Sequence, residues 1–259
     1  MKGGVQTAIN EHRERMKMNK WLYDEFKHCG VDYSKAKQAE MYDDQHQKFR
    51  DYEKEFKGMM DFLELQNTEN KTIVDLGCGT GATSIFAADL FKTVYAVDVS
   101  DVMIEKAKGK LDRNVHNLKF VNAGFLSYEH EGEPADLVIT KAAFHHLPDF
   151  WKQIALLRIN RMVKMGGLLY IHDVVFQFDP QEYVSKINSW ISGFEKVAGE
   201  EFRLEVETHI RDEYSTFGWI MNRMLEKAGF AVEKCKSDDD FVTEYACRKV
   251  NELNCEETA

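Results

Sequence analysis

The chain of 259 residues is long enough for one large domain, or for one domain with an elaborated cap. An apolar content of 44% supports a sizeable core, and only three prolines argue against a disordered linker. The net charge of −10 disfavours a nucleic-acid partner, because proteins that grip phosphates usually present a basic surface.

Cysteine usage and hydropathy indicate the compartment. The five cysteines show no C-x-x-C spacing, and their odd number is typical of reduced thiols. No apolar run reaches the length of about 18 residues that a membrane helix needs, and the first residues carry no apolar targeting segment. We therefore expect a cytoplasmic protein without membrane insertion.

The first 66 residues are predicted to form a helical cap. Helical composition covers residues 5–29 and 36–66, and residues 30–34 separate the two stretches. In the second stretch, apolar side chains recur every seven positions, at Tyr42, Phe49, Phe56 and Leu63. This period places them on one face of a helix.

Strands and helices alternate after the cap. Buried strands are predicted at residues 71–76, 93–98, 117–122, 136–140 and 167–176. Helical stretches lie between them at residues 82–90, 101–111 and 149–164. Such an alternation predicts an α/β domain with parallel strands and right-handed crossovers.

The pattern changes after the fifth strand, where residues 177–216 are predicted to form an insertion over the active site. Residues 180–197 read as an amphipathic helix, whereas residues 199–216 fit no single type of element. The insertion is therefore expected to be at least partly helical.

The last part of the domain is predicted as a helix followed by a hairpin. The helix covers residues 217–228, with Ser215 or Thr216 as its N-cap and Gly229 as its stop. The remaining predicted segments are strands at residues 230–236 and 241–249 and a disordered tail at residues 251–259.

Residues 71–81, Lys-Thr-Ile-Val-Asp-Leu-Gly-Cys-Gly-Thr-Gly, carry the most informative motif of the chain. A buried strand leads into a turn with three glycines, in which the backbone can approach a ligand. Gly77, Gly79 and Ala82 also satisfy the spacing of a dinucleotide fingerprint, with Asp98 about 20 residues further on. The glycines alone therefore leave the ligand open.

Asp75 favours S-adenosylmethionine over a dinucleotide. A carboxylate two residues before the first glycine would repel a pyrophosphate, whereas it suits the ammonium group of S-adenosylmethionine. The ribose hydroxyls of that ligand can donate to Asp98 at the end of the second strand.

The chain resembles the class I S-adenosylmethionine-dependent methyltransferases, and in particular small-molecule members such as the ubiquinone and menaquinone C-methyltransferases. The resemblance is carried by residues 74–81, 94–100, 135–140, 145–149 and 165–169. It implies a doubly wound, mostly parallel seven-stranded sheet with a Rossmann-like fold. The methyltransferase domain is then expected at residues 67–250, after an N-terminal helical cap at residues 1–66.

The resemblance also implies contacts with the methionine part of the cofactor. The backbone of Gly77, Cys78 and Gly79 would touch it, and Asp75 would lie near its ammonium group. Lys141 follows the fourth strand, within reach of the methionine carboxylate or of the acceptor. A solvated lysine is the alternative.

The adenosine end of the implied site departs from the family. Asp98 is expected on the ribose and Val99 on the adenine. Many members carry an acid after the third strand that accepts from the adenine amino group, but this chain has Gly124 there. Adenine recognition then falls to the amide and ring of Phe125 or to Asn122, unless Phe125 only packs a turn.

Histidines near carboxylates are the candidate acid–base groups. His145 and His146 resemble a pair found in many small-molecule methyltransferases, although a packed, hydrogen-bonded histidine is the alternative. His46 in the cap, and His209 one helical turn before Glu213, are groups that take a proton near neutral pH. Solvated ion pairs are the alternative interpretation of these clusters.

The sequence thus predicts an enzyme that transfers a methyl group from S-adenosylmethionine to a small molecule. No metal is expected, because no ligand spacing such as H-E-x-x-H occurs. Two alternatives remain open: a methyltransferase that acts on protein or RNA, and a protein that binds the cofactor without catalysis. The acidic charge and the helical cap favour the small-molecule enzyme.

Overall fold

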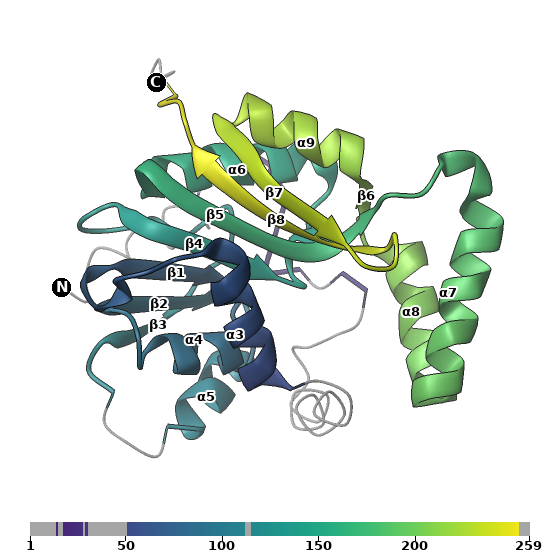
Figure 1. Cartoon of the computed structure of the whole chain (residues 1–259), viewed down its shortest axis with the longest axis horizontal. Coiled ribbons are helices and arrows are strands. Elements are labelled where there is room, and N and C mark those ends of the chain that lie inside the picture. Colours follow the sequence, from purple (N-terminus) through teal and green to yellow (C-terminus); the bar gives the residue numbers. More distant parts are fainter. Residues whose placement is uncertain (1–13, 15–17, 28, 31–50, 112–114, 254–259) are drawn as a thin grey trace.

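A twisted sheet with helices on both faces forms the body of the molecule (Figure 1). The computed structural model describes residues 14, 18–27, 29–30, 51–111 and 115–253. Among these residues, no helix combines the length and the apolar content that crossing a bilayer requires.

The sheet has the strand order β3-β2-β1-β4-β5-β8-β7. Its strands are β1 (Thr72–Leu76), β2 (Thr93–Asp98), β3 (Leu118–Asn122), β4 (Ala135–Lys141), β5 (Val163–Phe176), β7 (Phe230–Ser237) and β8 (Val242–Lys249). The first five are parallel to one another, and β8 runs antiparallel between β5 and β7. The two-residue strand β6 (Thr216–Phe217) pairs with the end of β5. The predicted doubly wound, mostly parallel sheet is confirmed.

Helices cover the two faces and extend beyond one end of the sheet. One face carries α3 (Tyr52–Leu63), α4 (Ala82–Ala87) and α5 (Asp101–Gly109), and the other carries α6 (Asp149–Met162) and α9 (Gly218–Lys227). The helices α7 (Tyr183–Ala198) and α8 (Glu200–Asp212) pack on each other beside the sheet (Figure 1). The described residues also contain three short 3-10 helices: η1 (Thr68–Asn70), η2 (Phe144–His146) and η3 (Pro180–Glu182).

Alternate residues of the central strands supply two apolar cores. In β1, Val74 and Leu76 belong to the core that includes residues of α6 and α9, whereas Ile73 belongs to the core under α3 and α4. Burial on both faces is what a parallel sheet between helices requires. The two cores hold the carboxyl ends of the parallel strands at one edge, where open α/β sheets bind ligands.

The described part of the N-terminus differs from the prediction of a helix over residues 5–29. Residues 19–27 form turns and irregular backbone. The side chain of Asp24 accepts a hydrogen bond from the amide of Phe26 at 3.1 Å, a local bond that competes with helix formation. Contacts of Tyr23 and Glu25 with distant residues also hold this segment against the sheet domain.

The second predicted cap helix is shorter than expected within the described residues. Asp51 is the N-cap of α3, and its side chain accepts from the amide of Lys54 at 3.0 Å. The helix ends at Leu63 because Glu64 adopts the left-handed conformation. The rest of the prediction, residues 36–50, lies outside the described residues.

The ambiguous stretch at residues 199–216 is mostly helix α8, followed by β6. The prediction of Ser215 or Thr216 as N-cap of the next helix is wrong, because α9 begins after Phe217, which makes no side-chain cap. The hydroxyl of Ser215 contacts His209, and that of Thr216 donates to Asp149. Both side chains therefore bond to other residues and not to the first amides of α9.

The first glycine of the turn after β1 gives a stability test. Gly77 has φ +75°, and a Cβ there would lie 2.4 Å from the Cβ of Ala143. We expect Gly77→Ala to lower the free energy of unfolding by about 2–5 kcal/mol, from backbone strain and overpacking. Gly79 has φ +53° with nothing within 4 Å of a built Cβ, so Gly79→Ala should cost only about 1–2 kcal/mol. Equal losses in urea unfolding would contradict this account.

Candidate active site

A cavity of about 330 Å³ opens at the carboxyl edge of the sheet, where β1, β2 and β4 end. The loops after these strands, the segment after β3 and part of the described N-terminal segment surround it. Its lining includes nine of the residues predicted to contact the cofactor, but not the alternative candidate Asn122: Asp75, Gly77, Cys78, Gly79, Asp98, Val99, Gly124, Phe125 and Lys141.

Asp75 is a buried acid at one end of this cavity. Its side chain accepts a hydrogen bond from the hydroxyl of Ser84 at 2.6 Å. Burial raises the pKa of Asp75 to about 6, although Ser84 and the charge of Lys141 act in the opposite direction. A cationic ligand group beside the carboxylate would offset the free energy that its burial costs.

Asp98 is oriented by backbone amides at the end of β2. One carboxylate oxygen accepts from the amide of Gly79 and the other from the amide of Ser100, both at 2.8 Å. Burial raises the pKa of Asp98, and the two amides lower it. Each oxygen keeps a second lone pair that a ligand hydroxyl can use.

Lys141 connects the end of β4 to helix α3. Its Nζ lies 3.0 Å from Oε2 of Glu55, and the lysine side chain is 11% exposed. The pair therefore places a cation on the cavity wall, close enough to lower the pKa of Asp75.

Phe125 adds an aromatic side chain to the lining of the cavity. The ring of Phe125 is buried and packs edge-on against Phe144, with 5.2 Å between the ring centroids. Asn122 donates from its side chain to the carbonyl groups of Asp98 and Val99, at 3.1 and 2.9 Å. Asn122 is not part of the cavity lining, so we assign it to holding the end of β2 rather than to a ligand.

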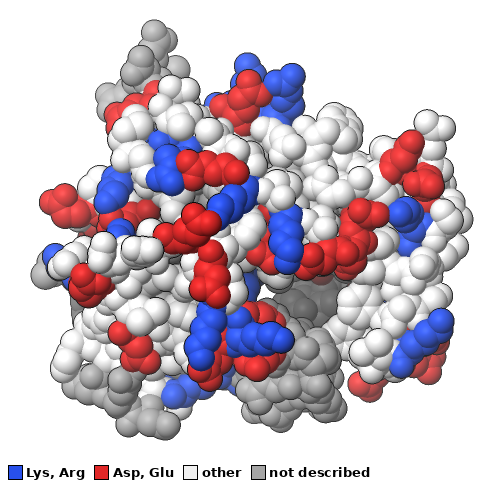
Figure 2. Space-filling view, viewed as in Figure 1, with Lys and Arg blue, Asp and Glu red and all other residues white. Residues whose placement is uncertain are grey.

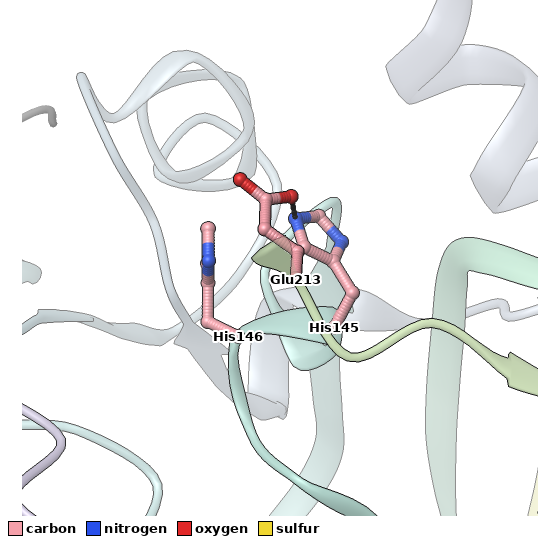
Figure 3. Close-up of side chains that lie close together, drawn as sticks. All are labelled: His145, His146 and Glu213. Atoms are coloured by element: carbon pink, nitrogen blue, oxygen red, sulfur yellow. Dashed lines mark ion pairs between the residues drawn. The ribbon is translucent and has the colours of Figure 1, made fainter. Parts of the chain in front are cut away.

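Three titratable residues from separate segments meet beside the cavity (Figure 3). His145 and His146 lie on η2, and Glu213 follows α8. Nε2 of His145 lies 3.3 Å from Oε2 of Glu213, as the dashed line marks. Of the three, His146 lines the cavity, whereas His145 and Glu213 are not part of the lining.

His145 lies between two carboxylates. Its Nδ1 lies 2.5 Å from Oδ1 of Asp173 near the end of β5, and Nε2 faces Glu213. Burial disfavours a charged imidazole, but the two carboxylates outweigh it and raise the pKa of His145. The same contacts lower the pKa of Asp173 against the effect of burial. This arrangement favours the imidazolium form of His145 between the two carboxylates.

Glu213 also contacts His209, one helical turn earlier. The other nitrogen of that ring, Nε2, lies 2.7 Å from the hydroxyl of Ser215. Burial opposes ionisation of Glu213, but the bond from His209 and the charges of His145 and His146 lower its pKa to about 2. Three of the four predicted acid–base candidates are thus together, and the fourth, His46, lies outside the described residues.

His146 has the opposite electrostatic character. Burial lowers its pKa to about 3, and the charge of His145 acts in the same direction. The ring is therefore neutral at physiological pH and presents a hydrogen-bonding imidazole to the cavity. Its carbonyl accepts from the hydroxyl of Tyr23 at 3.0 Å, which ties the N-terminal segment to the loop after β4.

Tyr23 and Glu25 line the cavity although no motif in the sequence indicates it. Their contribution depends on how the N-terminal segment folds back on the domain. The helical composition of residues 5–29 gave a helix prediction instead, and no local pattern distinguishes the two outcomes.

Residues 73–167 match the model of a family described as a methyltransferase domain. Over these residues the chain is similar to class I S-adenosylmethionine-dependent methyltransferase domains. An uncharacterized methyltransferase of Geobacillus sp. (strain WCH70) is 27% identical over 203 residues, which are 75% of this chain and 86% of that protein. S-adenosylmethionine is the methyl donor of this class.

Solved methyltransferases share the fold. A SAM-dependent methyltransferase from Aquifex aeolicus has a TM-score of 0.57 and 19% identity, covering 83% of this chain and 99% of that chain. Magnesium protoporphyrin IX methyltransferase from Synechocystis, with bound SAM, has a TM-score of 0.53 and 14% identity. The match covers 93% of this chain and 97% of that chain. The narrower resemblance to ubiquinone-type enzymes stays a prediction.

The cavity fits S-adenosylmethionine in three respects. A buried acid, Asp75, has a raised pKa that a ligand cation would relieve. A second acid, Asp98, is held at the cavity edge with free acceptor capacity. A Cβ at Gly79 would meet nothing within 4 Å, so the turn leaves open space between the two acids.

Cofactor affinity should depend on pH through Asp75. Its raised pKa of about 6 means that the carboxylate is protonated below that pH and ionised above it. A ligand ammonium needs the ionised form. Affinity for S-adenosylhomocysteine should therefore rise about tenfold between about pH 5 and pH 7 and then level off. Calorimetry of Asp75→Asn should give a flat profile, and an unchanged pH dependence in that variant would contradict the assignment.

The histidine cluster provides a test of the metal prediction. His145, His146 and Glu213 form a group whose ligand atoms lie within 4.8 Å of one another, as a metal site would require. However, His145 is already held as a cation between two carboxylates, and a metal would have to displace its proton. We expect methyl transfer to survive EDTA. Loss of activity with EDTA, restored by one divalent ion, would overturn this expectation.

Proposed function

We propose that the domain methylates a small molecule and that its cofactor binds in the cavity at the edge of the sheet. The ammonium group of S-adenosylmethionine is assigned to Asp75, with the methionine chain along the backbone of Gly77, Cys78 and Gly79. Lys141 is assigned to the methionine carboxylate. All five residues line the cavity, which supports this assignment.

The adenosine part is assigned to the opposite end of the cavity. The ribose hydroxyls donate to Asp98, and the purine lies between Val99 and the region of Gly124 and Phe125. Val99 and Phe125 both line the cavity, and backbone amides orient the carboxylate of Asp98, which supports this direction of the cofactor.

Bound S-adenosylmethionine supplies an activated methyl group, which leaves the sulfonium with the C–S electron pair going to sulfur as the acceptor nucleophile forms the new bond. The chain orients the acceptor and excludes water. His146 is the residue proposed to meet the acceptor, because its neutral imidazole can accept a hydrogen bond from a hydroxyl, thiol or amine. A pKa near 3 makes it a weak base, which favours acceptors that lose their proton readily or need not lose one.

His145, His209 and Glu213 are proposed as positioning residues rather than direct contacts. Asp173 and Glu213 hold His145 from two sides, and His209 holds Glu213. Burial keeps His146 neutral, and the positive charge at His145 acts in the same direction. A role for His46 stays a prediction.

A small acceptor is favoured by the size and cover of the cavity. About 330 Å³ leaves limited space beside a bound cofactor, and residues of the N-terminal segment form part of the wall next to His146. We also propose that residues 1–66 act as a cap on the domain at residues 67–250, since Tyr23 and Tyr52 both line the cavity. On the described surface in Figure 2, basic and acidic side chains are interspersed without a continuous basic band.

Substitution of His146 tests the proposed function. In a panel of small-molecule acceptors, formation of S-adenosylhomocysteine identifies a substrate of the wild type. With that substrate, His146→Ala should lower kcat/KM roughly ten- to hundredfold, because the acceptor loses its hydrogen-bonding partner. Affinity for S-adenosylhomocysteine, measured by calorimetry, should change less than about twofold.

His116→Ala is the matched control, because this histidine is exposed and lies outside the cavity lining. It should retain wild-type turnover. Full activity in His146→Ala with intact cofactor binding would contradict the role of His146. Turnover on protein or RNA, with none on the metabolite panel, would contradict a small-molecule acceptor.

A further inference from the structure

Glu25 lies at the purine end of the cavity although it comes from the N-terminal segment. It lines the cavity and is 9% exposed. A Cβ built on Gly124 would lie 2.4 Å from Oε2 of Glu25 and 2.6 Å from Cγ1 of Val99. The Glu25 carboxylate therefore occupies the space that a side chain at position 124 would need.

The two oxygens of this carboxylate differ in their hydrogen bonds. Oε2 accepts from the amide of Leu126 at 2.9 Å, and Ser127 lies close enough to lower the pKa of the Glu25 carboxyl group. Oε1 is buried and has no hydrogen-bond partner among the described residues. Burial raises the pKa of Glu25, against the effect of these bonds and of Arg158. A buried acceptor without a partner is costly and indicates that a ligand donor belongs beside it.

The neighbours of Glu25 identify the chemistry of that donor. Val99 follows Asp98, so a ligand whose ribose binds Asp98 places its base next to Val99 and Glu25. Within adenine, the exocyclic amino group is the hydrogen-bond donor. We propose that Glu25 accepts a hydrogen bond from this amino group and thereby selects adenine at the base end of the cavity.

This role explains why glycine stands at position 124. A residue with a side chain there would collide with the Glu25 carboxylate or with Val99. The acidic group that recognises the base thus comes from the N-terminal segment, and not from the segment after β3. The same N-terminal segment carries Tyr23, which bonds to the carbonyl of His146. Base recognition and the acceptor wall therefore share one piece of chain.

Two ligands that differ at a single position of the base test the proposal by calorimetry. S-inosylhomocysteine carries a carbonyl oxygen where S-adenosylhomocysteine carries the amino group. The wild type should bind S-adenosylhomocysteine roughly ten- to hundredfold more tightly, the effect expected of one hydrogen bond to a charged group. Equal affinity for the two ligands in the wild type would overturn the proposal without any substitution.

Glu25→Gln separates recognition from a structural role. The amide of Leu126 requires an oxygen at the Oε2 position, so the new amide nitrogen should take the Oε1 position and donate to the ligand. The variant should therefore bind both ligands equally or prefer S-inosylhomocysteine. Asp24→Asn, which alters the neighbouring side chain that bonds to the Phe26 amide, should keep the wild-type preference.

The outcomes distinguish this inference from the cofactor assignment on which it rests. A Glu25→Gln variant that weakens both ligands by the same factor would show a structural role only and would overturn the proposal. Failure of the wild type to bind either ligand would overturn the assignment of the cavity as well. A reduced or reversed preference confined to Glu25→Gln supports the proposal.

Discussion

The carboxylate of Asp173 fixes the loop on which the site depends. Near the end of β5 it is 2% exposed, and its Oδ2 accepts from the amides of Ala143 and Phe144 at 3.2 and 2.7 Å. Its Oδ1 binds the ring of His145 at 2.5 Å. A charge buried this deeply is tolerated because donors surround it and an imidazolium balances it. The loop after β4 is thereby held with His146 on the cavity wall.

The cavity itself is built around acids whose burial is unfavourable in the absence of a ligand. Asp75, Asp98 and Glu25 all line it, and burial raises the pKa of each. In the proposed assignment each has a different complement in S-adenosylmethionine: the ammonium group, the ribose hydroxyls and the base amino group. A cofactor bound in this way would relieve a desolvation cost at three points and stabilise the folded state.

Sequence patterns predict the local features and leave out those that depend on tertiary structure. The strand and glycine turn around Asp75, and the strand end at Asp98, follow from short-range periodicity and spacing. The pairing of His209 with Glu213 follows from helical spacing. The contact of Glu213 with His145 depends instead on where α8 packs against the sheet domain. The helix predicted over residues 5–29 is interrupted because the bonds that hold the segment cross more than 100 positions of sequence.

A crystal structure of the complex with S-adenosylhomocysteine tests the central claim most directly. We predict that the amino acid part lies along Asp75 and the glycine turn, that the ribose contacts Asp98, and that the sulfur faces His146. Binding of the ligand outside this cavity, or within it with the sulfur turned away from His146, would contradict the account.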